Sequence, residues 1–383
     1  MISEEILLNG ENQYVEYTEK IDNIDSITSE IVAFLNSEGG MIIIGINDSG
    51  EVVGVDDIKK AEEQITNICR FNCLPEAVPA IEFEDVRGKK VVIAHIPKGL
   101  DKPYRTINGH YYLRVGSTKR KASREELSRL FQLSGFLHYD EGPVPGSSES
   151  DIDVTLVRKY YLKVFNKNID DLGIDIQQFF QNIKVIKAEN KELYATVAGL
   201  LVFGKAPQDF LPNSRISAVR FIGNGVSSEM IDRREITGTL PELIDQAQAF
   251  IIRNIKNSTK FDGTVRKDIY EYPPEAIREL IVNAVVHRNY SISGSQIRIY
   301  IFNDRLEVRS PGRLPNTITI ENIRYGNHFT RNPLIAKLMI NLGYMEDIGL
   351  GIPKVYDSMK KHNNTEPKFY VRDHDFIATL ISL

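Results

Sequence analysis

Two side chains in the C-terminal third of the sequence have the types and spacing of a phosphoryl-transfer site. Glu279 and Asn283 follow Pro273-Pro274 in a segment whose pattern predicts a helix, and a spacing of four places them on one face. A carboxylate so placed can act as a catalytic base that activates water, and the amide can bind Mg²⁺. Taken alone, this pair is equally typical of an ordinary amphipathic helix.

Two glycine-containing loops follow this helix. The loop Ser310-Pro-Gly312 comes after a predicted strand at 305–309, and Gly349-Leu-Gly351 precedes a helix that we expect to begin near residue 352. Glycine before a helix allows the backbone to approach phosphate groups closely at the helix N-terminus. The ordered set of one helix and two loops therefore predicts a nucleotide-binding site that includes Asn283, Ser310, Gly312, Gly349 and Gly351.

A strongly basic stretch suggests a nucleic-acid partner. Residues 1–86 contain 19 Asp and Glu against 4 Lys and Arg, whereas residues 87–124 contain 11 Lys and Arg and one acidic residue. Basic side chains interleaved with tyrosines combine phosphate contacts with stacking on bases. The candidate nucleic-acid-binding residues are Arg105, Arg114, Lys119, Arg120, Lys121 and Arg124. The alternative is a solvated surface whose charges pair with the preceding acidic stretch.

The 383 residues are enough for two or three domains of the α/β (α+β) class. We expect an N-terminal mixed-sheet domain over 1–138, a linker over 139–152, a helical or mixed middle segment over 153–262 and a C-terminal α/β sandwich over 263–383. Within the first domain the pattern predicts a helix near 26–37, a buried strand at 41–46 and a helix over 57–70. Asn108-Gly109 predicts a hairpin between strands 104–107 and 110–115.

Several classes of protein are excluded by composition and motifs. No apolar run approaches the length of a membrane span, so no membrane partner is expected, and the acidic N-terminus indicates a cytoplasmic location. Cys69 and Cys73 have no further ligands nearby for zinc, so we expect them to pack in a core. The segment Gly199–Ala206 superficially matches a phosphate-binding P-loop, but its loop positions are apolar and Ala206 replaces the magnesium-binding hydroxyl.

Residues 272–383 resemble the GHKL (Bergerat-fold) ATPase module. In this resemblance Glu279 and Asn283 form the N box, Ser310-Pro-Gly312 the G1 box and Gly349-Leu-Gly351 the G2 box. The resemblance implies ATP and Mg²⁺ as ligands, Glu279 as the catalytic base and Asn283 as a metal ligand. Ser310 stands where the aspartate that reads adenine is found in that family.

Residues 3–135 resemble the Schlafen AlbA-like domain through Ala33–Gly40, Gly45–Gly50 and Tyr112–Ser117. The whole chain is similar to bacterial and archaeal transcriptional regulators that couple this domain to a GHKL module. In nuclease members of the Schlafen family a metal site is built from three carboxylates, and the matching residues are Glu11, Glu16 and Asp48. The resemblance implies Mn²⁺ or Mg²⁺ if this site cleaves nucleic acid. Thr18 replaces a lysine common in that motif.

Three functions remain open from the sequence. The first is a nucleic-acid-binding transcriptional regulator with a divergent ATP-binding module, which could retain weak ATPase activity. The second is a metal-dependent endonuclease that acts on structured RNA or DNA through Glu11, Glu16 and Asp48. The third is a catalytically inactive scaffold, in line with Ser310 and Thr18. We expect nucleic acid and a nucleotide as partners and a homo-oligomer as the assembly, since a dimer doubles the number of phosphate contacts.

Overall fold

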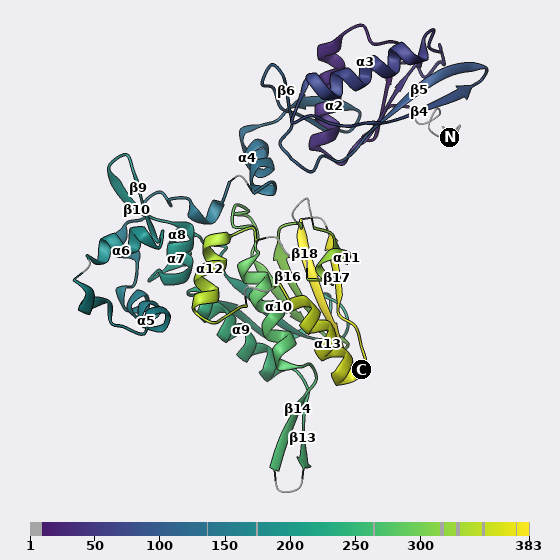
Figure 1. Ribbon diagram of the computed structural model, residues 1–383. Coiled ribbons are helices and arrows are strands. Elements are labelled where there is room, and N and C mark those ends of the chain that lie inside the picture. Colours follow the sequence, from purple (N-terminus) through teal and green to yellow (C-terminus); the bar gives the residue numbers. More distant parts are fainter. Residues whose placement is uncertain are drawn as a thin grey trace. The chain divides into compact units, whose positions relative to one another are not determined.

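The computed structural model describes residues 10–382 apart from 136, 174, 263–264, 315–317, 327–329, 347–348 and 373 (Figure 1). The chain divides into two compact units, residues 1–137 (unit 1) and 138–383 (unit 2). Each unit has its own mixed sheet and its own hydrophobic core. The predicted α+β class is confirmed. No helix in the described part of the chain is long and apolar enough to cross a bilayer.

Unit 1 contains a four-stranded sheet with the strand order β1-β2-β5-β4. The strands are β1 (Val15–Thr18), β2 (Gly40–Ile44), β5 (Lys89–Ile96) and β4 (Ala80–Val86). Strands β1 and β2 are parallel because α2 (Ile24–Asn36) connects them, and the other pairs are antiparallel. Helices α2 and α3 (Ile58–Phe71) supply apolar side chains to the core on one face of this sheet.

The predicted helices and the buried strand of unit 1 are confirmed to within about three residues at each end. Asn23 caps α2 by accepting a hydrogen bond from the Ser26 N–H (3.0 Å). The chain then packs closely on this helix, since a Cβ at Gly40 of β2 would lie 2.4 Å from the Phe34 ring. Cys69 and Cys73 are buried free thiols, as expected for packing residues.

The predicted hairpin around Asn108-Gly109 is wrong in its strand pairing. Strand β7 (Tyr112–Val115) pairs with β8 (Thr118–Lys121), whereas β6 (Arg105–Thr106) pairs with β3 (Cys73–Leu74). The Asn36 side chain donates to the Tyr104 and Tyr112 carbonyls (2.7 and 3.0 Å) and holds both segments at the end of α2. Helix α4 (Arg124–Leu133) follows, with the predicted capping box at Ser123 and Glu126.

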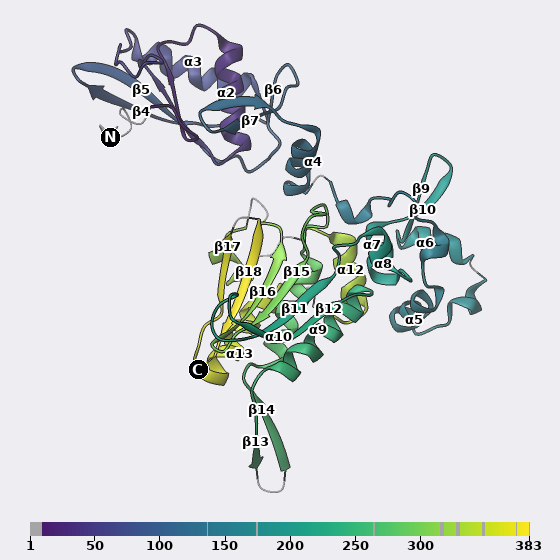
Figure 2. The ribbon, with the colours of Figure 1, turned by 180° about the vertical axis from the view of Figure 1, so that it is seen from behind.

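Unit 2 is built on a six-stranded sheet with helices on one face (Figure 2). In spatial order its strands are β12 (Glu229–Ile236), β11 (Ile216–Ile222), β15 (Ile297–Ile301), β16 (Arg305–Pro311), β18 (Asp375–Ile381) and β17 (Lys368–Arg372). The covering helices are α9 (Leu240–Asn254), α10 (Pro274–Val286) and α13 (Gly351–Asn363). Their apolar faces and the sheet form one continuous core.

The other elements of unit 2 are short and lie around this sandwich. They are α5 (Val154–Phe165), α6 (Ile176–Asn182), α7 (Val197–Phe203), α8 (Pro207–Phe210), α11 (Ile320–Ile323), α12 (Pro333–Asn341) and the pairs β9 (Ile186–Glu189) with β10 (Glu192–Ala195) and β13 (Asn257–Asp262) with β14 (Val265–Tyr270). Helix α7 is buried throughout, and a Cβ at Gly199 would lie 2.2 Å from the Val185 carbonyl oxygen. This packing agrees with the rejection of a P-loop there.

Two expected boundaries differ from the structure. Residues 139–152 are not a free linker, because Val144 and Ile152 belong to the core of unit 2. Asp140 is fully buried and accepts a hydrogen bond from the Ile335 N–H at the start of α12 (2.9 Å). No boundary falls near residue 262 either, because β11 pairs in parallel with β15 across that position. The middle and C-terminal segments thus share one sheet.

Candidate functional site

Helix α10 places the predicted acid and amide together on the side that faces α13. Asn283 Nδ2 donates a hydrogen bond to Glu279 Oε1 (2.6 Å), as the spacing of four residues requires. Burial raises the pKa of the Glu279 carboxyl, and the hydrogen bond from Asn283 opposes this shift. A half-buried carboxyl with a raised pKa is suited to accept a proton from water.

The glycines of the two loops pack so closely on neighbouring residues that larger side chains would not fit without movement. A Cβ at Gly351, the first residue of α13, would lie 1.7 Å from Glu279 Oε1. Gly312 has a φ of +124°, which disfavours other residues, and its Cβ would lie 2.4 Å from Arg331 Nη1. The glycines therefore allow the loops to pack directly on the side chains of the site.

These residues line one cavity of about 850 Å³ in unit 2. The predicted catalytic base Glu279 and the five predicted nucleotide-binding residues all contribute to its wall: Asn283, Ser310, Gly312, Gly349 and Gly351. The Ser310 hydroxyl is buried and donates to the Ala284 carbonyl (2.7 Å), so only its lone pairs remain to accept a hydrogen bond. The volume lies within the range of about 300–1,000 Å³ that is usual for small-molecule sites.

Sequence reasoning missed the cations in the wall of this cavity. Arg331 lies in the wall and donates to the His287 carbonyl (3.3 Å) and to the Arg313 carbonyl, and burial lowers its pKa to about 10. Lys354 of α13 lines the same wall and pairs with Glu346. A single arginine or lysine in a loop or helix has no spacing pattern, so the sequence offered no signal for these residues.

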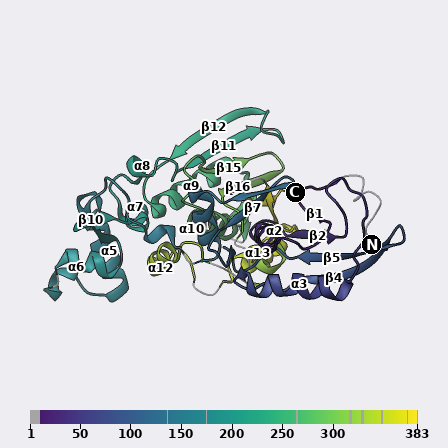
Figure 3. The same cartoon turned by 90° about the horizontal axis from the view of Figure 1, so that it is seen from above.

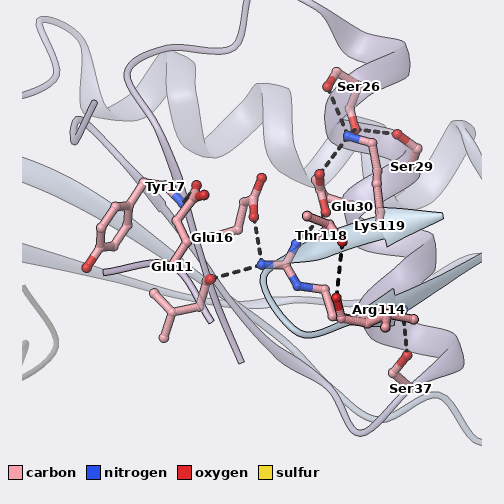
Figure 4. Close-up of polar contacts among 12 residues, drawn as sticks. Glu11, Glu16, Tyr17, Ser26, Ser29, Glu30, Ser37, Arg114, Thr118 and Lys119 are labelled. Carbon is pink, nitrogen blue, oxygen red and sulfur yellow. Dashed lines mark hydrogen bonds and ion pairs between the residues drawn. The ribbon is translucent and has the colours of Figure 1, made fainter. Parts of the chain in front are cut away.

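In unit 1, residues that the sequence predicted to bind a metal or nucleic acid form a buried charge cluster around Arg114 (Figure 4). The Arg114 guanidinium pairs with Glu16 of β1 (2.7 Å) and with Glu30 of α2 (2.8 Å), and its side chain is wholly buried. It also donates to the Asn12 and Val15 carbonyls (2.9 and 3.1 Å). Arg114 therefore joins the edge strand β1 to helix α2 and is not available to a phosphate, contrary to expectation.

Two further side chains extend this cluster. Lys119 of β8 pairs with Glu30 (2.6 Å), and Glu11 accepts a hydrogen bond from the Tyr17 N–H (3.1 Å). Burial raises the pKa of Glu16 to about 7, the negative charges of Glu30 and Glu11 add to this, and Arg114 opposes it. The cluster thus holds three carboxylates against two cations.

The remaining predicted residues of unit 1 are distributed over its surface. Asp48 lies in the exposed turn after β2, six residues beyond the register partner of Glu16, and not beside Glu16. Among the described residues no group of three or more acidic, histidine or cysteine side chains is arranged to hold a metal. Of the basic residues, Arg120 pairs with Glu126 (2.6 Å), Arg105 is half-buried, and Lys121 and Arg124 are exposed.

Comparison with known families assigns both ends of the chain. Residues 11–123 match the family model Schlafen, AlbA_2, and residues 294–380 match the model described as "Putative ATP-dependent DNA helicase recG C-terminal". The chain thus carries an N-terminal Schlafen AlbA_2 domain and a C-terminal ATPase-like domain. A domain of unknown function matches residues 128–217, and no curated protein matches the chain.

The two assigned domains point to a nucleic-acid-related function. The AlbA_2 match begins at Glu11 and includes the whole buried charge cluster. The match to the ATPase-like domain begins after α10, so it includes Ser310, Gly312, Gly349 and Gly351 but not Glu279 or Asn283.

Two solved structures are similar to the chain. A crystal structure of the DIP2311 protein from Corynebacterium diphtheriae is 22% identical, with a TM-score of 0.49, and the alignment covers 97% of this chain and 75% of that one. The solution structure of the N-terminal domain of a RecG-related protein from Nitrosomonas europaea is 25% identical, with a TM-score of 0.25. That alignment covers 32% of this chain and 95% of that one.

Proposed function

We propose that this protein is a nucleic-acid-binding transcriptional regulator whose ATPase-like domain binds ATP with Mg²⁺ in the cavity of unit 2. The observation that carries the proposal is the convergence of α10, β16 and α13 on one cavity. Side chains and loops up to 72 positions apart in the sequence meet there, and a Cβ at Gly351 would collide with Glu279.

The residues of the cavity fit a nucleotide with its metal ion. Asn283 would bind Mg²⁺ through its amide oxygen, and the cations Lys354 and Arg331 would offset phosphate charge. The Ser310 hydroxyl already donates to a backbone carbonyl, so toward a base it can only accept a hydrogen bond. When bound, Mg²⁺ supplies neutralisation of phosphate charge, and Glu279 would hold and deprotonate the attacking water.

The proposal is tested by measuring ATP affinity by calorimetry in Gly351→Ala and in the control Gly294→Ala. A Cβ at Gly351 would collide with the Glu279 carboxylate, so the wall of the cavity must rearrange, whereas a Cβ at Gly294 meets nothing within 4 Å. We expect ATP affinity to fall about tenfold or more in Gly351→Ala, an energy of ~1.4 kcal/mol, and to be unchanged in the control. Equal ATP affinity in both variants, or no ATP binding by the wild type, would contradict the proposal.

For nucleic acid in unit 1, the exposed cations Lys121 and Arg124 are the best-placed contacts. Mobility-shift assays with duplex DNA and structured RNA should show weaker binding by Lys121→Glu/Arg124→Glu, and the wild-type binding should weaken with salt. The same assay with Mn²⁺ tests the nuclease alternative, which is less well supported because Arg114 occupies the Glu16 carboxylate. Metal-dependent cleavage lost in Glu16→Gln would favour the nuclease, and absence of any binding would favour the scaffold.

A further inference from the structure

The six-stranded sheet of unit 2 has one face that no described helix of unit 2 covers. Helices α9, α10 and α13 pack on the opposite face, and the view from behind shows the strands in front of them (Figure 2). The view from above shows strands β11 and β12 on the side of the layer away from α13 (Figure 3). Sheets with antiparallel pairs commonly have one face packed on the core and one face in solvent, so the side chains on this second face are available to a partner.

The strand registers show which side chains share this face. Residues paired across neighbouring strands point to the same side of a sheet. One row across the sheet consists of Tyr370, Ile377, Arg309, Arg298, Ser217 and Glu235. The adjacent row consists of Lys368, Thr379, Glu307, Tyr300, Val219 and Arg233. The two rows thus contain four cations, two tyrosines, two glutamates and four smaller side chains, and Val219 and Tyr300 form a small apolar cluster with Phe221 and Phe302.

One acid of this face lies beneath two arginines. The Glu307 side chain is only 4% exposed and pairs with both Arg305 (2.6 Å) and Arg309, whose side chains remain 23% and 22% exposed. Asp375 similarly pairs with Arg298. Arg305 also pairs with Asp304 (2.9 Å), so these ion pairs balance most of the charge. Arg309 contacts Glu307 through Nε and Nη2, which leaves the donors of its Nη1 for an anion.

Aromatic rings hold the same arginines flat against the sheet. The Arg305 guanidinium lies 4.0 Å from the centre of the Phe302 ring, and that of Arg309 lies 4.9 Å from the Tyr300 ring. Such stacking fixes the orientation of the cations before any ligand binds. At the edge strand β17, Tyr370 is 37% exposed between the exposed cations Lys368 and Arg372.

We infer that this uncovered sheet face, which we call the arginine face, binds a single-stranded nucleic acid. Its arginines and Lys368 would contact successive phosphates, and Tyr370 would stack on an unpaired base. A single strand fits better than a duplex because the tyrosine needs a base that is not already enclosed between neighbours. The inference concerns a surface separate from the nucleotide cavity and from unit 1, so it does not depend on ATP binding.

The test uses the full chain and a fluorescent single-stranded oligonucleotide. The variant Lys368→Glu/Arg372→Glu changes two exposed cations for which the described residues offer no ion-pair partner. The control Lys159→Glu/Lys360→Glu makes the same change in net charge at exposed positions of α5 and α13. We expect affinity to fall at least tenfold in the first variant only, and the slope of log affinity against log salt to decrease by about 1.4, or ~0.7 per lost phosphate contact. Tyr370→Ala should weaken binding without changing that slope.

Other outcomes would overturn the inference. Equal affinity in the variant and the control would show that the arginine face does not bind a single strand. Tighter binding of a duplex, with the same sensitivity to the variant, would assign the face to duplex backbone. A change in mass by light scattering, without a change in affinity, would assign it to a second copy of the chain. Calorimetry with ATP on the same variant separates these results from the proposed function, since nucleotide affinity should be unchanged.

Discussion

Replacing Arg114 by methionine tests whether the charge cluster of unit 1 is held together by this one guanidinium. Methionine keeps much of the side-chain length but removes the positive charge between Glu16 and Glu30, which lie 2.7 and 2.8 Å from it. Removal of one partner from a buried ion pair leaves uncompensated charge and destabilises proteins by about 3–5 kcal/mol. We expect a loss of this size in the free energy of unfolding of unit 1, measured by urea denaturation at about pH 8.

The loss of stability should depend on pH and should be specific to Arg114. Without Arg114 the two carboxylates repel each other, so protons bind more tightly to the folded than to the unfolded state, and the loss should shrink at about pH 5. Arg120→Met removes an arginine of the same hairpin whose partner Glu126 is near the surface, so its effect should be small. An Arg114→Met loss below about 1 kcal/mol, or one of equal size at both pH values, would show that charge pairing does not hold the cluster.

Two other perturbations have clear expected outcomes. The folded-state pKa of Glu16 is raised from 4.5 to about 7, so its contribution to stability is present below the lower value and is lost as the pH rises through the higher one. The stability of unit 1 should therefore decline between these pH values in thermal unfolding, and Glu16→Gln should remove that decline; a wild-type curve without it would contradict the shift. In unit 2, Asp140→Ala leaves the buried Ile335 N–H without its acceptor and should cost about 1–3 kcal/mol in urea denaturation, whereas a flexible linker there would predict no change.

Local signals in the sequence were enough to group residues that the fold brings to one cavity, whereas their role in nucleotide binding stays a prediction. The helix of Glu279 and Asn283 is specified by prolines at its start and by the spacing of its side chains, and the loops by their glycines. Each signal lies within a few residues, and the six predicted side chains and loops do line one cavity. What could not be predicted is the contact of Gly351 with Glu279, because it depends on how α13 packs on α10.

The role of Arg114 was not predictable for a different reason. In the sequence it stands in a basic stretch, and such stretches favour a solvated or anion-binding surface. Its partner Glu30 lies 84 positions earlier in the sequence, in α2. The two residues come together only when the chain folds. The same limit applies to residues 139–152, whose Gly, Pro and Ser content is typical of a linker although Val144 packs in the core.

The pairing of Arg114 bears on where nucleic acid binds. Charge counted along the sequence places the basic surface in unit 1. In the folded chain, however, three of these basic residues, Arg114, Lys119 and Arg120, pair with glutamates. The cations of the arginine face are scattered over strands between residues 233 and 372 and form no run in the sequence. Strand register collects them on one face, where Glu307 is buried beneath Arg305 and Arg309. Strand register is therefore a better guide to a polyanion-binding surface in this chain than charge counted along the sequence. We expect Lys368→Glu/Arg372→Glu in β17 to weaken single-strand binding more than Lys121→Glu/Arg124→Glu in unit 1.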